Sequence, residues 1–456
     1  MAATTASIGA PAWWNAGYTG QGVDVAMIDS GVSRVSGLDG AGKVVYGPDL
    51  SLESQAPNLT NLDTYGHGTF MAGLIAGNDG QPGGYRGVAP DARIVSLKVA
   101  TADGGADVSQ VIAGIDWVVQ HAHDPGMNIR VINLSYGTNS TQAYGVDPLA
   151  FAVEQAWKHG IVVVAAAGNS GYQKGAGSPC LADPAYDPFA IAVGGTDTRG
   201  TVTEKDDQMG SYSSAGAASC KSPDFVAPGS HMQGLRDPNS WIDVNHPEGA
   251  LDAHYFRGSG TSEATAFVSG AAALVLQKYP NLTPDQVKAY FAANALGLSA
   301  TIGFQQGKGE IQLEQMLKKG PGGTSAQKFT NSTGDGSLEL SRGQDHISQD
   351  GVLLTSDQDI FGQSVDASHL AAAEGSGSSW SGGSWNGSSW SGSSWSGSSW
   401  SGSSWSGSSW SGSSWSSSNW SSNTWTGSSW SGSSWSGSSW SGSSWSGNTW
   451  ASAGWY

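Results

Sequence analysis

The feature that most constrains the fold of this sequence is a set of short, uninterrupted apolar runs separated by segments with helical periodicity. The run at 161–167 (IVVVAAA) has no alternation of apolar and polar residues, which predicts a strand covered on both faces. Comparable runs occur at 23–29, 93–100, 129–135 and 189–195. Strands that alternate with helices form a mainly parallel sheet between two helical layers. We therefore expect a three-layer α/β fold, with the functional site at the carboxyl ends of the strands.

Two helices have clear sequence signals. The segment 283–295 (TPDQVKAYFAANA) begins with a capping box formed by Thr283 and Gln286, and Pro284 occupies its first helical position. The segment 261–280 (TSEATAFVSGAAALVLQKYP) is long and apolar, and it stops at a proline. We expect the second helix to lie in the interior.

Charge and composition narrow the classes of partner. The formal net charge of −17 argues against a nucleic acid or an anionic membrane. No apolar run is long enough to span a membrane. The N-terminus lacks the basic and apolar regions of a secretory signal. The two cysteines, Cys180 and Cys220, are enough for one disulfide but do not fix a compartment.

The composition divides the chain into three parts. We expect a folded domain over 1–319, a polar, Gly-rich linker over 320–375 and a low-complexity tail over 376–456. In the tail, Trp recurs at every fifth position from 380 to 455, with mainly Ser and Gly between. A period of five fits neither a strand face nor a helix face. A disordered linker, a stacked solenoid and a tryptophan surface that binds sugars or peptides all remain open.

Three polar residues lie where elements meet loops. Asp29 ends the first apolar run, His67 lies between two glycines, and Ser262 opens the long apolar helix. A serine nucleophile needs a histidine as base, and a buried aspartate orients the imidazole. The chain order Asp, His, Ser is one of the orders in which this triad occurs. The simpler interpretations are a turn-capping aspartate, a core histidine and a helix-capping serine.

A fourth polar residue, Asn169, follows the apolar run at 161–167. A side-chain amide beyond a buried strand can donate a hydrogen bond to an oxyanion. Its simpler interpretation is a turn residue.

Together these motifs resemble those of the subtilases, the subtilisin-like serine proteases. The matching stretches are VAMIDSGV around Asp29, HGTFMAGLIAG from His67, AAAGNS around Asn169, DFVAPG, and GTSEATAFVSG around Ser262. The resemblance covers roughly residues 7–318. It implies a subtilisin-like fold and a serine endopeptidase that works through an acyl-enzyme, with no cofactor required for catalysis. Asp29, His67 and Ser262 would be its triad and Asn169 its oxyanion donor.

Four positions depart from the family pattern. Glu263 stands where the family usually has Met, and Ala266, Phe267 and Phe70 replace Pro, His and His. A charge that faced the oxyanion would oppose catalysis, so we expect the Glu263 carboxylate to point toward solvent or a partner. The alternative function is a catalytically inactive subtilase fold that acts as a binding or cell-surface module.

The resemblance also implies a substrate site. An extended peptide would pair with two backbone segments, and a small apolar wall would form the primary pocket. The implied residues are Gly104, Gly105, Ala106, Ser135, Tyr136, Gly137, Ala166 and Gly168. Tyr136 with Val108 and Val111 would line a second apolar pocket. We expect broad specificity, with a preference for apolar or aromatic side chains before the cut bond.

The remaining expectations concern metals, the disulfide and location. Structural calcium is common in the family, and Asp39, Asn78 and Asp79 are candidate ligands. A disulfide between Cys180 and Cys220 is favoured over two unpaired thiols. We expect a secreted or cell-surface monomer that acts on proteins or peptides, with polysaccharide as a candidate ligand of the tail. A protease inside the cell is the alternative.

Overall fold

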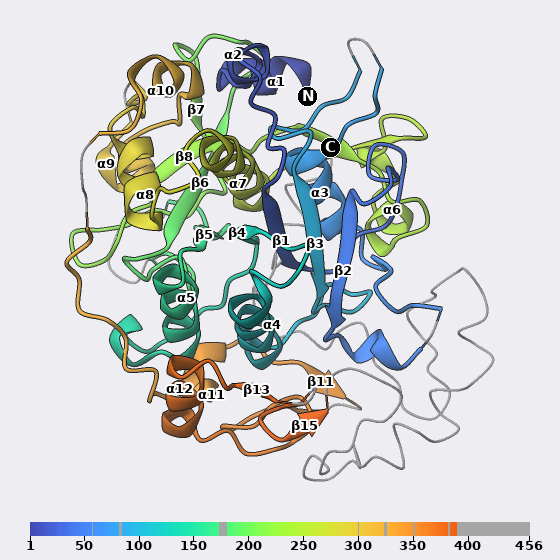
Figure 1. Cartoon of the computed structure of the whole chain (residues 1–456), viewed down its shortest axis with the longest axis vertical. Helices are drawn as coiled ribbons and strands as arrows, with labels where there is room; N and C mark the ends of the chain where they lie inside the picture. The colour runs from blue at the N-terminus through green and yellow to red at the C-terminus, as the bar shows by residue number, and fades with distance from the viewer. Residues whose placement is uncertain are drawn as a thin grey trace.

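The computed structural model describes residues 1–56, 58–81, 84–172, 180–299, 301–322, 326–349, 352–381 and 384–389. A central sheet lies between helices on both faces (Figure 1). Its eight strands run in the order β2-β3-β1-β4-β5-β6-β7, with β8 beside β6. The strands are β1 (Asp24–Asp29), β2 (Val44–Asp49), β3 (Arg93–Lys98), β4 (Ile129–Leu134), β5 (Val162–Ala166), β6 (Ile191–Asp197), β7 (Gln208–Met209) and β8 (Phe225–Pro228).

All strand pairs of this sheet are parallel except β6 with β7. The expected α/β class with a mainly parallel sheet is confirmed. Every residue of β1 and of β5 is buried, as the unbroken apolar runs predict.

The helices form the outer layers. Helices α3 and α7 pack together on one face of the sheet, and α4 and α5 pack together on the other (Figure 1). The helices are α1 (Ala2–Ser7), α2 (Ala10–Asn15), α3 (His67–Ala76), α4 (Val108–His121), α5 (Pro148–Lys158), α6 (Trp241–Asn245), α7 (Thr261–Lys278), α8 (Pro284–Ala292), α9 (Gly303–Gln306), α10 (Leu313–Lys319), α11 (Leu338–Arg342) and α12 (Ala367–Gly375).

Short elements complete the described chain. They are the 3₁₀ turns Leu52–Gln55, Tyr144–Val146 and Pro247–Gly249, the pair β9 (Met232–Leu235) and β10 (Tyr255–Gly258), the pair β11 (Ser348–Gln349) and β12 (Val352–Leu353), and a small sheet of β13 (Trp380–Ser381), β14 (Ser384–Trp385) and β15 (Ser388–Ser389).

The two helix signals read from the sequence correspond to α7 and α8. The capping box of α8 is present, with Thr283 and Gln286 bonded reciprocally. Helix α7 is buried along its first 16 residues, because small residues on every side let it contact α3 and the strands β4, β5, β6 and β8 closely. Its position fixes the helix N-terminus, where Ser262 lies, above the carboxyl ends of the strands.

The segment expected to be a linker does not pack like one. Leu338, Ile347 and Phe361 of this segment are buried in the same apolar cluster as the sheet residues, and so is Trp385, which belongs to the part expected to be a low-complexity tail. The described residues between 326 and 389 are called here the C-terminal segment. Helix α11 contacts α4, and α12 contacts α5, so this segment adds a layer outside those helices (Figure 1). Its apolar residues occur in short runs, such as 352–354 and 360–361, which are too short to show a helix or strand period. The repeats beyond residue 389 lie outside the described residues.

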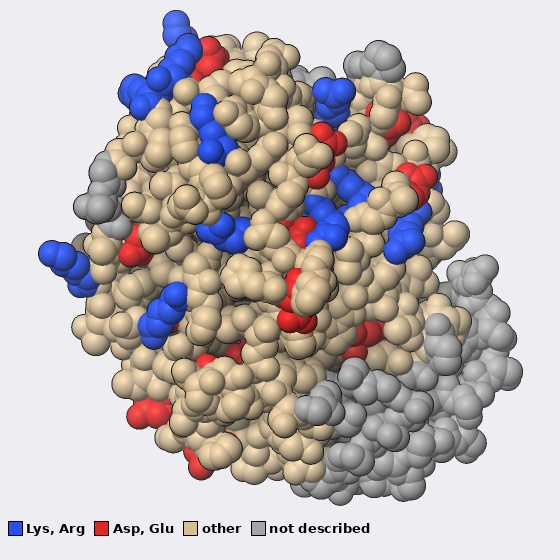
Figure 2. All heavy atoms as spheres, viewed as in Figure 1, with Lys and Arg blue, Asp and Glu red and all other residues tan. Residues whose placement is uncertain are grey.

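The surface shows no dominant sign of charge on the face in Figure 2. Lys and Arg side chains lie there in separate small groups among uncharged residues. Within the described ranges, no helix combines the length and the apolar character needed to cross a membrane.

Candidate active site

Asp29, His67 and Ser262 each lie at the end of an element. Asp29 is the last residue of β1, which is central in the sheet between β3 and β4. His67 is the first residue of α3, and Ser262 is the second of α7. All three side chains are buried, at no more than 1% exposed.

The aspartate and the histidine are bonded directly. His67 Nδ1 lies 2.7 Å from Asp29 Oδ1, and the Ser30 N–H donates to the same oxygen at 2.7 Å. Burial raises the pKa of Asp29, and the adjacent His67 opposes that rise. This contact fixes the orientation of the imidazole ring.

A glycine permits this close contact. A Cβ atom on Gly68 would lie 2.0 Å from the Gly31 carbonyl oxygen and 3.1 Å from Asp29 Oδ1. Any larger residue would push the first turn of α3 away from the end of β1. In the Gly-His-Gly pattern of the sequence, the second glycine, Gly68, is thus required by close packing against the end of β1.

Ser262 is not the cap of its helix, because Gly260 is the N-cap residue. The Ser262 hydroxyl lies 3.5 Å from the Ser135 carbonyl oxygen, and the Ser135 hydroxyl donates to the Ser262 carbonyl at 3.2 Å. Ser262 therefore sits in the first turn of α7, beside the end of β4. The start of a helix favours negative charge at this position.

Asn169 is held in one orientation by the same helix. Its Oδ1 atom accepts hydrogen bonds from the Thr261 N–H at 2.9 Å and from the Thr261 hydroxyl at 3.0 Å. Because the Oδ1 atom faces Thr261, the Nδ2 atom on the other side of the amide points away from Thr261. Both Asn169 and Ser262 line the same cavity.

Glu263 does not face solvent, and this corrects the expectation. Its side chain is 0% exposed, and both carboxyl oxygens are buried with no hydrogen-bond partner. The third residue of a helix can fold its side chain back over the N-cap, and here Oε2 would lie 2.8 Å from a Cβ on Gly260. The absent side chain of Gly260 leaves this space.

The buried position changes the charge of this acid. Burial raises the pKa of Glu263 to about 8, and the negative charge of Asp29 adds to the rise. At neutral pH Glu263 is therefore mainly a neutral carboxylic acid. A neutral carboxylic acid does not repel an oxyanion, so Glu263 in this state does not oppose catalysis.

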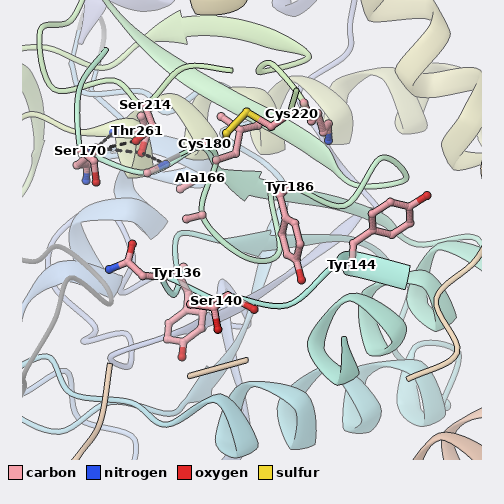
Figure 3. Close-up of a pocket in the computed structure, with 18 of the residues that line it drawn as sticks. Tyr136, Ser140, Tyr144, Ala166, Ser170, Cys180, Tyr186, Ser214, Cys220 and Thr261 are labelled. Carbon is pink, nitrogen blue, oxygen red and sulfur yellow. Dashed lines mark hydrogen bonds between the residues drawn. A yellow bond between two sulfur atoms is a disulfide. The ribbon is translucent and has the colours of Figure 1, made fainter. Parts of the chain in front are cut away.

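The cavity beside Ser262 has a volume of about 670 Å³ (Figure 3). It brings together most of the residues that the sequence proposed for substrate binding, namely Ser135, Tyr136, Gly137, Ala166 and Gly168, together with Asn169 and Ser262. The other proposed residues, Gly104, Gly105 and Ala106, are buried and do not line it.

The structure does not bring the three residues of the expected second apolar pocket together around the cavity. Val108 and Val111 of α4 are buried in the core and do not line the cavity, whereas Tyr136 does. Helix α4 is contacted by α11 of the C-terminal segment.

Three aromatic residues of the cavity were missed by the sequence reading. Tyr144, Tyr186 and Phe329 line it, and Figure 3 shows the two tyrosine rings beside the cavity. Phe329 comes from the C-terminal segment and packs edge-on against Phe189 at 5.9 Å between ring centres. No motif spacing marks these residues, because they come from separate loops.

The structure also gives the positions of the two cysteines and of Asp183. Cys180 and Cys220 form a disulfide, and both line the cavity. Asp183 is 1% exposed, and burial raises its pKa well above the usual range, with Asp147 adding to the rise. Asp183 does not line the cavity, so it is not placed to bind a basic substrate side chain.

The candidate calcium ligands serve as turn caps. Asp79 accepts from the N–H groups of Gln81 and Tyr85, and Asn78 accepts from that of Gly80. Asp39 accepts a bond from a backbone N–H of its own turn at 3.3 Å. In the part of the chain that the structure describes, no three His, Cys, Asp or Glu side chains are grouped to hold a metal. Structural calcium stays a prediction without a ligand set.

Comparisons with known proteins agree on one family. A family model described as "Subtilase family" matches residues 20–332. Serine protease AprX of Bacillus subtilis (strain 168) is 38% identical over 276 residues, which cover 59% of this chain and 60% of AprX. Subtilisin DY of Bacillus licheniformis is 36% identical over 299 residues, 65% of this chain and 92% of that protein. A solved structure of a cold adapted subtilisin-like serine proteinase aligns with 65% of this chain and 88% of its own, at 31% identity and a TM-score of 0.48.

Proposed function

We propose, from the premise that this chain belongs to the subtilase family of serine endopeptidases, that Asp29, His67 and Ser262 are its catalytic triad. The observation that carries this proposal is the 2.7 Å contact between His67 and Asp29, fully buried, on the same sheet edge as Ser262. No cofactor takes part in the chemistry of such a triad.

The proposed reaction has two halves. Ser262 Oγ attacks the peptide carbonyl carbon while His67 takes the hydroxyl proton, and the histidine then gives that proton to the departing amine. Water attacks the resulting acyl-enzyme in the same way, and Ser262 regains its proton as the acid product leaves. Asp29 stays ionised throughout and stabilises the imidazolium.

We propose that Asn169 and the start of α7 stabilise the oxyanion. The Oδ1 side of Asn169 is held by Thr261, so its Nδ2 donor needs no reorganisation when the charge develops. The N–H groups of the helix start add positive partial charge at the same place.

The proposed substrate is an extended peptide with an aromatic or apolar residue before the cut bond. Main-chain pairing with Ser135–Gly137, which lines the cavity, would hold the peptide on one side, and the buried segment Gly104–Ala106 is the proposed second pairing segment. Ala166 and Gly168 would leave room for a large side chain, and the aromatic rings around the cavity would contact it. Asp183 does not line the cavity whereas Lys221 does, which disfavours a basic side chain.

The experiment compares two short peptide anilides that differ only in having Phe or Lys before the scissile bond. We expect kcat/KM to favour Phe by tenfold or more, and Ser262→Ala to abolish both reactions. Equal rates for the two substrates would remove the proposed specificity. An inactive wild-type enzyme would instead favour the non-catalytic alternative.

We also propose that the protein acts outside the cytosol. The Cys180–Cys220 disulfide supports this, because disulfides persist mainly in oxidising compartments. Fractionation of the producing cells, followed by thiol titration of the recovered protein, tests it. Recovery of both thiols reduced from the cytosol would contradict it.

A further inference from the structure

The segment 337–347, called here the strap, lies against both walls of the proposed substrate groove. It follows the part of the chain that the family model matches, which ends at residue 332. The strap contains α11 and is continuous with the buried apolar residues of the C-terminal segment. Its contacts fall on the residues that directly follow the two proposed substrate-pairing segments.

The first wall is held by an ion pair. Asp107 follows Gly104–Ala106, and Arg342 of the strap donates to it through Nε at 2.6 Å and Nη2 at 3.2 Å. Both side chains are 0% exposed. Asp107 also caps α4 by accepting from the Ser109 N–H at 2.9 Å. A two-point contact of this kind fixes direction as well as distance.

The second wall is held by hydrogen bonds that each join a side chain to a backbone group. Thr138 follows Ser135–Gly137, and its hydroxyl donates to the Ser341 carbonyl. The Asn139 N–H donates to Asp345 Oδ2 at 2.9 Å. A Cβ on Gly343 would lie 2.0 Å from the Asn139 carbonyl oxygen, so the strap and this wall touch at van der Waals distance.

From this juxtaposition we propose that Arg342 is a positioning residue, which sets the separation of the two walls that an extended peptide must bridge. The inference rests on the proposed function, since it takes those two segments as the peptide's pairing partners. A groove of fixed width binds a peptide without losing further conformational entropy. The effect acts on the binding of extended substrates, and the triad is not in contact with the strap.

The test uses two substrates and one pair of variants. The substrates are a hexapeptide anilide, which pairs with both walls, and an acetyl-phenylalanine ester, which has no residues upstream to pair. The main variant is Arg342→Met with Asp107→Asn, because removing both charges leaves no unpaired charge buried and Asn still caps a helix well. The matched control is Glu339→Gln, which touches Arg342 at 3.2 Å on its more exposed side and leaves both bonds to Asp107.

We expect the double variant to raise KM for the hexapeptide about fivefold, the effect of about one lost hydrogen bond, with kcat within twofold. Both constants for the ester should stay within twofold, and the control should match the wild type on both substrates. Arg342→Lys, which keeps the charge but not the two-point geometry, should raise the hexapeptide KM by a smaller factor.

Equal changes for the ester and the hexapeptide, or an unchanged hexapeptide KM, would overturn the proposal and leave the ion pair a structural one. If the double variant does not fold, the Arg342→Lys variant tests the proposal in its place. A KM for the hexapeptide equal to that of the wild type would then overturn the proposal. A wild-type enzyme that cleaves neither substrate would contradict the proposed function instead.

Discussion

The catalytic centre and the strap are both buried polar regions, yet they use their hydrogen-bonding groups differently. The guanidinium of Arg342 donates to Asp107, to Glu339 and to the backbone carbonyls of Ser356 and Gln358. At the catalytic centre, one oxygen of Asp29 and both oxygens of Glu263 are buried with no partner.

We interpret the hydrogen bonds of Arg342 as a structural network and those around Asp29 and Glu263 as part of a reacting centre. An unsatisfied buried polar group costs about 1–3 kcal/mol, and the guanidinium network of Arg342 avoids that cost, although Glu374 Oε1 and Ser388 Oγ elsewhere in the C-terminal segment do not. A reacting centre has a reason to keep such groups, because they must meet charge or protons that exist only during the reaction. The comparison predicts that changes at the centre act on turnover and changes in the C-terminal segment act on stability or substrate binding.

The largest expected effect is at the triad. Ser262→Ala and His67→Ala should each lower kcat by about 10⁶-fold, a magnitude known from subtilisin itself. Because the residues act as a unit, the double variant should lose little more than either single one. Steady-state kinetics of the three variants measure this. Ser269→Ala, two turns along α7, is the matched control and should keep normal turnover; strictly additive losses would contradict the triad.

The second effect is at the oxyanion donor. Asn169→Ala should lower kcat by about 10²–10³-fold with little change in KM, again the magnitude measured in subtilisin. Asn169→Asp keeps an oxygen that accepts from Thr261 but loses the Nδ2 donor. It should therefore lose as much turnover as the Ala variant. An active Asp variant would show that the contact with Thr261, and not the donor, is what matters.

The third effect tests the other side of the comparison, in the C-terminal segment. Trp385 is 0% exposed, and its indole N–H donates to Asp116 at 2.6 Å. Trp385→Ala should lower the free energy of unfolding by about 3 kcal/mol and leave kcat unchanged. The half-buried Trp380 is the matched control and should cost about 1 kcal/mol. Denaturant unfolding followed by kinetics of the folded fraction measures both, and equal losses would contradict the burial difference.

The smallest effect is the pH dependence set by Glu263. Its pKa is about 8 in the folded protein and 4.5 ordinarily, so it ionises within the site as the pH rises through 8. The charge then opposes the oxyanion, with Asp29 and Tyr212 as the titratable groups that interact with it. Glu263→Gln should match the wild type in kcat near pH 6 and exceed it about tenfold at pH 10, or ~1.4 kcal/mol of barrier.

Ionisation of Glu263 also makes the free energy of unfolding depend on pH. Between pH 4.5 and 8 the folded state binds more protons than the unfolded state, so the wild type loses stability as the pH rises through that window. Glu263→Gln removes this loss and should become the more stable protein above pH 8. Unfolding curves at pH 5 and pH 9 measure the crossover. A Gln variant that is less active at every pH would instead make the carboxyl a part of the reaction.

The sequence alone predicted the sheet, α7, α8 and the polar residues at the ends of β1 and β5. These features have local causes: unbroken apolar runs, a capping box, and glycines beside the reactive residues. The position of the Glu263 side chain was predicted wrongly, because the space over Gly260 exists only once α7 is packed against the strands. The aromatic lining of the cavity was not predicted, since Tyr144, Tyr186 and Phe329 are distant in sequence.

What the sequence determined by itself was the order of the elements and the chemistry they carry, because hydrophobic periodicity and short motifs depend on neighbouring residues. What only the tertiary structure decided was the role of the C-terminal segment and the charge state of the buried acids. Arg342 donates a hydrogen bond to Asp107, which is 235 positions away in the sequence. No local pattern encodes a partner at that sequence separation. Burial, which raises the pKa of Glu263, likewise depends on the packing of α7 against the strands, which no local pattern in the sequence encodes.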